Sequence, residues 1–227
     1  PDMRGHGHSG KPTKPGAYEM KNFVLDIDSI LKKEGIRKAH FIGHSMGAII
    51  ALYYYKLFKD RVRSIIVINP DIKVPLRLRI LPGIKPLLRI AKKFDQGRRE
   101  LIDFFLTERS GFCIRSLAQF AKNDKKLRIR LFQNVKVPTL YIRSGKDRVI
   151  PRRDFEKSFR LLQGADLFKL ETARHDVFLR SPIEAGRAII HFFVANHLVS
   201  PMQASAALAI VLLSMSVGFF SQPELVS

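Results

Sequence analysis

The sequence predicts an α/β protein with a mostly parallel, doubly wound sheet. Short apolar segments of strand character alternate with segments whose apolar residues recur at helical spacing. A glycine-rich turn also joins one of these strands directly to the helix that follows it. Strands separated by helices favour a parallel sheet with helices on both faces, and 227 residues are enough for one such domain.

The first part of the chain supplies two helices and two strands. Apolar residues at helical spacing between Phe23 and Leu31 predict the first helix, and Gly35 ends it. The elements expected next are a short buried strand at 38–42, a helix at 48–58 and another apolar strand at 64–69.

The last part of the chain supplies two more strands and a closing helix. β-branched and aromatic residues predict a strand at 137–143, and weak alternation predicts another at 165–170. Ser181 to Glu184 fits a capping box with proline at the first helical position, so a helix is expected from there to about His197.

Between these parts, residues 72–134 show no evident strand and interrupt the alternation of strands and helices. Three prolines interrupt basic segments of predicted helix, with sixteen lysine or arginine residues and five aspartate or glutamate residues. We therefore assign residues 1–71 and 135–198 to an α/β core and residues 72–134 to a basic helical insertion.

The most informative motif is Gly43-His44-Ser45-Met46-Gly47, which fits G-x-S-x-G and lies between a predicted strand and a predicted helix. A serine at such a junction sits on a strained turn, and the flanking glycines avoid a clash with a Cβ atom. The start of the following helix favours negative charge that develops near the hydroxyl. Ser45 is therefore the candidate nucleophile.

A nucleophilic serine needs a base and a group that orients the base. Asp147 and His175 each follow one of the two later strands, in the chain order serine, acid, histidine. Each has a plainer interpretation, because a loop aspartate often caps a helix, here one opening at Pro151, and a loop histidine is usually solvated. Their order beyond separate strands favours Ser45, Asp147 and His175 as a triad.

Three stretches resemble the α/β-hydrolase superfamily, namely Asp2 to Ser9, the elbow from Gly43 to Ala48, and Gly145-Lys146-Asp147 followed by His175. The resemblance is greatest to the esterase and monoacylglycerol-lipase-like branch, with Ala48 where that branch has a second elbow glycine. It covers roughly residues 1–70 and 135–195, and it implies that the basic insertion is a cap over the active site.

The resemblance implies a serine hydrolase that cleaves carboxylic esters of small to medium lipophilic substrates through an acyl-enzyme. His175 would accept the Ser45 proton, Asp147 would orient the imidazole, and the backbone N–H of Met46 would bind the oxyanion. No metal or organic cofactor is required. Serine in place of aspartate argues against the epoxide hydrolase and haloalkane dehalogenase branches. Asp71 is the reserve acid, because some family members place the carboxylate there.

The family also carries three strands and a helix before the Arg-Gly-His-Gly loop, whereas this chain begins at Pro1, almost on that loop. We therefore expect a fragment, or an N-terminal part that comes from elsewhere. The loop that gives the second oxyanion amide has no counterpart, and losing one such donor costs about 3–4 kcal/mol. The edge of the strand at 38–42 is expected to be unpaired. The alternative function is a membrane-tethered, non-catalytic module with an incomplete site.

The chain is strongly basic, with a formal net charge of +20, and this charge limits the classes of partner that it is expected to bind. Nucleic acid is disfavoured, because no recognised motif or aromatic stacking platform accompanies the basic residues. An anionic membrane surface fits residues 73–93 better, where seven basic residues and no acid interleave with leucine and isoleucine. The plainer alternative is a solvated face on a cap whose apolar side chains line the substrate pocket.

The C-terminal residues 199–227 contain a hydrophobic run. Residues 204–220 are seventeen residues without a charge, at the lower limit for a helix that spans a bilayer. A tail anchor is favoured over a last helix on the sheet, because the helix ending near His197 already takes the family's final place. The expected location is the cytoplasm, or a membrane reached through residues 204–220.

Few other residues are candidates for metal binding, a disulfide or catalysis. The single cysteine, Cys113, excludes an internal disulfide and a cysteine metal cluster. His6 and His8 have no carboxylate at ligand spacing and are interpreted as loop structure, and His44 is interpreted as a packing residue. Peptidases, thioesterases and carbon–carbon hydrolases share the triad, so the sequence does not separate these activities or fix the oligomeric state.

Overall fold

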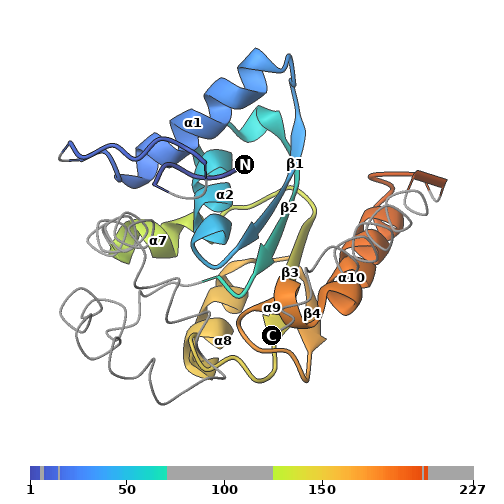
Figure 1. Ribbon diagram of the computed structural model, residues 1–227. Helices are drawn as coiled ribbons and strands as arrows, with labels where there is room; N and C mark the ends of the chain where they lie inside the picture. Colours follow the sequence, from blue (N-terminus) through green and yellow to red (C-terminus); the bar gives the residue numbers. More distant parts are fainter. Residues whose placement is uncertain (6–7, 15, 71–124, 201, 204–227) are drawn as a thin grey trace, which may run out of the picture.

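The structure is a computed structural model that describes residues 1–5, 8–14, 16–70, 125–200 and 202–203 (Figure 1). Most of the predicted cap, with Asp71 and Cys113, lies outside these residues, and so do His6 and the hydrophobic run at 204–220. Membrane binding through residues 73–93 or 204–220 therefore stays a prediction. No helix in the described part is long and apolar enough to cross a bilayer.

Four parallel strands form one sheet in the order β1-β2-β3-β4. They are β1 Ala39–His44, β2 Val62–Ile68, β3 Thr139–Ser144 and β4 Asp166–Leu170. The predicted α/β class with a parallel sheet is thus confirmed. Because the strands are parallel, their C-terminal ends lie at one edge of the sheet, and the loops after β1, β3 and β4 leave from that edge.

Helices cover both faces of the sheet, with α1, α2 and α7 on one side and α10 on the other (Figure 1). The helices are α1 Met20–Lys33, α2 Met46–Leu57, the short 3-10 helix η1 Lys59–Arg61, α7 Lys125–Leu131, α8 Arg152–Leu161, α9 Val177–Arg180 and α10 Pro182–Ala195.

The strand β2 divides the hydrophobic core between the two faces. Ile65 and Val67 belong to the cluster under α1 and α2, whereas Ile66 and Ile68 belong to the cluster under α10. All four side chains are fully buried. This continuous apolar run is typical of a parallel strand covered on both faces.

The structure differs from two local predictions, the burial of the strand at 38–42 and the capping box at Ser181. β1 was expected to be buried, but it lies at the edge of the described sheet, pairs only with β2 there, and leaves Ile42 48% exposed. The expected unpaired edge is therefore present. At α10, Pro182 occupies the first turn as predicted, but the Ser181 side chain makes no capping hydrogen bond.

The end of the predicted cap packs into the core. Leu131 and Phe132 at the end of α7 are buried in the cluster that contains α2. These residues therefore add to the layer of side chains that supports the helix after the elbow.

Candidate active site

Ser45 joins β1 to α2 with a backbone that few non-glycine residues adopt. Its φ is 52° and its ψ is −116°, so the predicted strained turn is confirmed. Its N–H donates to the carbonyl oxygen of Ile68 at 2.9 Å, which fixes the elbow to the end of β2. Within the first turns of α2, Ala48 to Ile50 are fully buried, and this packing holds the strained conformation in place.

The two glycines of the elbow have different roles. A Cβ atom at Gly43 would collide with the carbonyl group of Gly47 and would lie 2.6 Å from the Cα of Ala48. A Cβ atom at Gly47 would meet nothing within 4 Å in the described structure. The expectation that both glycines relieve a Cβ clash therefore holds for Gly43 alone, where β1 and α2 approach most closely.

Asp147 and His175, which are 28 residues apart, meet at the C-terminal edge of the sheet. The Nδ1 atom of His175 lies 2.8 Å from Oδ2 of Asp147. The other carboxylate oxygen, Oδ1, accepts the N–H groups of Val149 at 2.7 Å and Ile150 at 3.0 Å. The histidine-orienting interpretation of Asp147 thus fits Oδ2, whereas Oδ1 closes a turn before α8 and does not cap that helix, whose N-cap residue is Pro151.

This arrangement sets the proton positions on the imidazole. The carboxylate of Asp147 can only accept, so Nδ1 of His175 carries the proton and a neutral ring keeps a lone pair on Nε2. Burial alone would raise the pKa of Asp147, but the hydrogen bond and charge of His175 and the amides of Ile150 and Val149 outweigh it. The pKa of Asp147 therefore lies below its usual value, which favours the carboxylate.

His44 holds the loop of His175 from the elbow side. Its Nε2 atom lies 2.7 Å from the carbonyl oxygen of His175, and an oxygen that only accepts requires the proton on Nε2. Burial lowers the pKa of His44, and the nearby His175 lowers it further, which favours this neutral ring. The side chain also packs against Phe178 with an edge-to-face geometry. The packing role expected for His44 is therefore accompanied by a polar one.

Asn69 is a second residue that fixes this loop, and the sequence reasoning did not single it out. It follows β2 with a φ of 44° and is buried. Its side chain bridges to β3, since Oδ1 accepts the N–H of Ser144 at 2.9 Å and Nδ2 donates to the Ser144 hydroxyl at 2.8 Å. Nδ2 also lies 3.4 Å from the carbonyl oxygen of His175. Its position just after a strand of a parallel sheet was the available signal.

Ser45 and His175 are brought to the same region without a direct bond. The rings of His44, the neighbour of Ser45, and His175 have centroids 4.8 Å apart, which places the imidazole beside the elbow. In the described structure no hydrogen bond joins the Ser45 hydroxyl to the His175 ring. Catalytic hydrogen bonds are often long before substrate binds, so this geometry is compatible with a triad.

The described residues contain no group of three or more histidine, cysteine, aspartate or glutamate side chains that could hold a metal ion. Met46, the predicted oxyanion donor, is the first residue of α2, and its side chain packs against the core cluster that contains this helix.

Comparison with known proteins places this geometry in a wider context. Residues 1–108 match the family model described as alpha/beta hydrolase fold. Epoxide hydrolase 2 of Siraitia grosvenorii is 28% identical over 168 residues, which cover 73% of this chain and 46% of that protein. The chain thus spans less than half the length of this relative.

Solved structures agree on the fold. An α/β hydrolase enzyme, MGS-M2, from a Medee basin deep-sea metagenome library superposes with a TM-score of 0.69 at 22% identity, covering 85% of this chain and 77% of that one. The esterase EaEST from Exiguobacterium antarcticum gives a TM-score of 0.68 at 19% identity, with coverages of 84% and 79%. At these identities the likeness shows the fold alone.

The elbow yields a first testable prediction. Gly43→Ala should destabilise the protein by about 2–4 kcal/mol or prevent folding, because the new methyl group has no space without moving the Gly47 carbonyl. Gly47→Ala is the matched control and should stay within about 1 kcal/mol, since its site is open. Urea denaturation of both variants measures the difference, and equal stabilities would contradict the close approach of β1 and α2.

The hydrogen bond of His44 gives a second prediction. His44→Phe keeps the ring but removes the donor to the His175 carbonyl, so the amide of Val177, which donates to the same oxygen at 3.0 Å, should exchange about fivefold faster. His44→Gln retains a donor and should exchange at nearly the wild-type rate. Identical exchange in the phenylalanine variant and the wild type would remove His44 from the support of this loop.

The pKa of Asp147 gives a third prediction. Because its pKa is lowered on folding, the carboxylate stabilises the protein above the usual value of 3.8, and this contribution is lost as the pH falls through the lower folded-state pKa. Asp147→Asn should therefore be less stable by about 1–2 kcal/mol near neutral pH, where its charged hydrogen bonds are lost. Urea unfolding at several pH values should show the difference shrinking in acid, whereas a pH-independent difference would refute the assignment.

Proposed function

Because the chain has the α/β-hydrolase fold, we propose that it is a serine hydrolase that cleaves carboxylic esters of small to medium lipophilic acyl substrates. The observation that carries this proposal is the pairing of His175 with Asp147 beside an elbow whose serine has the strained conformation of a nucleophile. This combination supplies a candidate nucleophile, a candidate base and an acid that orients the base.

The proposed reaction begins when Nε2 of His175 takes the proton of the Ser45 hydroxyl as Oγ attacks the acyl carbonyl. Asp147 keeps Nδ1 protonated and stabilises the imidazolium that forms. The N–H of Met46, at the start of α2, would stabilise the oxyanion together with the positive end of that helix. The imidazolium then protonates the leaving alcohol, and water activated by His175 releases the acid from Ser45.

Ester hydrolysis is favoured over epoxide opening by the residue at the elbow. Several curated relatives are named epoxide hydrolases, which makes epoxide opening the second candidate function. Epoxide opening by a nucleophilic carboxylate would require aspartate at the elbow, whereas this chain has the hydroxyl of Ser45 there. A hydroxyl paired with an imidazole base is suited to acyl transfer, and a solved structural neighbour is named an esterase.

The test is active-site labelling and turnover of the purified protein. A fluorophosphonate probe should label the wild type, and p-nitrophenyl octanoate should be hydrolysed, while Ser45→Ala should abolish both. Ser29→Ala, an exposed serine on α1, is the matched control and should behave as wild type. Asp147→Asn should lower the labelling rate by about 10³- to 10⁴-fold, because the imidazole loses its orienting carboxylate.

Two outcomes would overturn the proposal. Absence of labelling and turnover in well-folded wild-type protein would favour a non-catalytic module with this fold. Hydrolysis of styrene oxide in preference to the ester would favour epoxide opening instead.

A further inference from the structure

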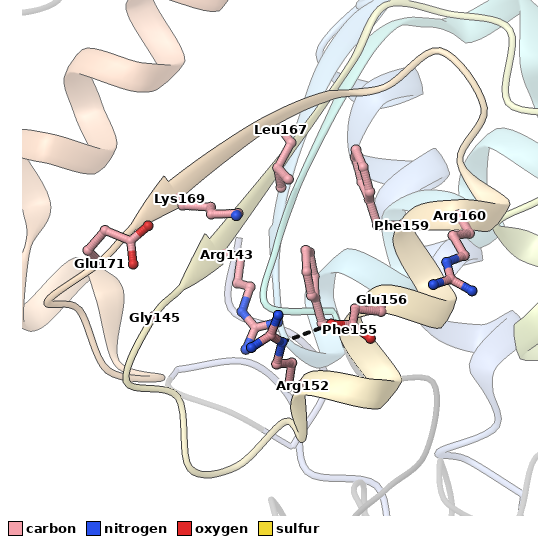
Figure 2. A pocket seen from close by; sticks show the side chains of 10 residues that line it. All are labelled: Arg143, Gly145, Arg152, Phe155, Glu156, Phe159, Arg160, Leu167, Lys169 and Glu171. Atoms are coloured by element: carbon pink, nitrogen blue, oxygen red, sulfur yellow. Dashed lines mark hydrogen bonds and ion pairs between the residues drawn. The ribbon is translucent and has the colours of Figure 1, made fainter.

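A groove lies between α8 and the neighbouring face of β3 and β4 (Figure 2). Its volume is about 430 Å³, within the range of about 300–1,000 Å³ that small-molecule sites occupy. Basic side chains from the strands and from α8 line one end, apolar side chains line the part next to it, and Arg160 lies beyond them on α8.

At the basic end, two cationic side chains occupy neighbouring positions on adjacent strands. Arg143 and Lys169 are register partners on adjacent strands, so both point from the same face of the sheet. Like charges in such a position repel each other. In the described structure neither has a carboxylate within ion-pair distance, and the Arg143 guanidinium instead lies 4.2 Å from the centre of the Phe155 ring. An unneutralised cation pair at the end of a groove is a feature that an anionic ligand would stabilise.

Acidic residues at the groove do not cancel this charge. Glu156 is already paired with Arg152 at 2.8 Å on the exposed side of α8, and Glu171 lines the groove beyond the end of β4. Arg143 and Lys169 from the strands and Arg152 from α8 all line the groove (Figure 2). The basic end therefore keeps a net positive charge.

The apolar end continues along the same face of the sheet. Leu167 precedes Lys169 by two residues on β4, points to the same side and is 36% exposed. The rings of Phe155 and Phe159 stack along α8 with centroids 6.0 Å apart and form the opposite wall. The two ends are separated by about 7 Å of strand, which suits a medium-length alkyl chain better than a long one.

This groove is separate from the candidate catalytic pair. Arg143 and Phe155 also line a gap next to Asp147, but the volume of that gap is only about 10 Å³. Such a space is at the lower limit for one water molecule. The two side chains thus form a wall between the groove and Asp147, and a ligand in the groove would not reach the carboxylate.

We propose that this groove is a binding site for a medium-chain alkyl carboxylate. The head group lies between the Arg143 guanidinium and the Lys169 ammonium, because a planar carboxylate matches the donor geometry of arginine. The alkyl chain lies between Leu167 and the stacked phenylalanine rings. Recognition requires both ends, so a neutral alkyl alcohol and a short carboxylate without a chain each bind more weakly.

The proposal is tested by isothermal titration calorimetry of the purified protein with octanoate, octanol and acetate. Octanoate should bind at least about tenfold more tightly than either control ligand. Lys169→Gln should weaken octanoate binding about tenfold, the equivalent of one charge-assisted hydrogen bond. Lys157→Gln, an exposed lysine on α8 outside the groove, removes the same charge and should leave the affinity unchanged.

A second pair of variants tests the apolar end. Leu167→Ser should weaken binding of octanoate but not of acetate, whereas Phe168→Ser, at the adjacent position on the other face of β4, should affect neither. Both sites are exposed, so circular dichroism should confirm that the variants fold. Equal affinities for octanoate and octanol, equal losses in the two lysine variants, or no binding of octanoate by the wild type would each overturn the proposal. The readout is binding alone, so the result does not depend on the proposed hydrolase activity.

Discussion

The hydrogen bond between Nδ1 of His175 and Oδ2 of Asp147 is the interaction on which the candidate site depends. It joins the loop after β3 to the loop after β4, and it selects the imidazole tautomer that leaves Nε2 free to act as a base. The parallel sheet makes this meeting possible, because it brings the ends of both strands to one edge. The burial of Asp147 then keeps water from competing for the bond, since its side chain is only 2% exposed.

The backbone carbonyl of His175 is held by several groups, in addition to the bond that orients its ring. His44 from the end of β1, Asn69 from the end of β2 and the amide of Val177 all approach this one oxygen. Asp147, which follows β3, adds a contact to the His175 ring. Residues at the ends of β1, β2 and β3 therefore all help to position the His175 loop. Such redundancy is expected where a catalytic side chain must stay within a fraction of an ångström of its working geometry.

Charge is distributed unevenly around this edge of the sheet. Near the elbow, burial lowers the pKa of His44 and so favours its neutral ring, while the lowered pKa of Asp147 favours a negative charge beside His175. On the other side of Arg143 and Phe155, the α8 groove concentrates positive charge with an apolar wall beside it. Arg143, near the end of β3, and Phe155 thus separate a site suited to proton transfer from a site suited to binding an anion.

The sequence by itself determined the order of strands and helices, the strained serine and the loops that carry Asp147 and His175. These features depend on local periodicity and on turn chemistry, which are set by residues close together in the sequence. Only the tertiary structure decided that Gly43 and not Gly47 lacks space for a side chain, and that His44 and Asn69 support the His175 loop. These outcomes depend on contacts between residues far apart in the chain, and no local pattern specifies which side chains those contacts will join.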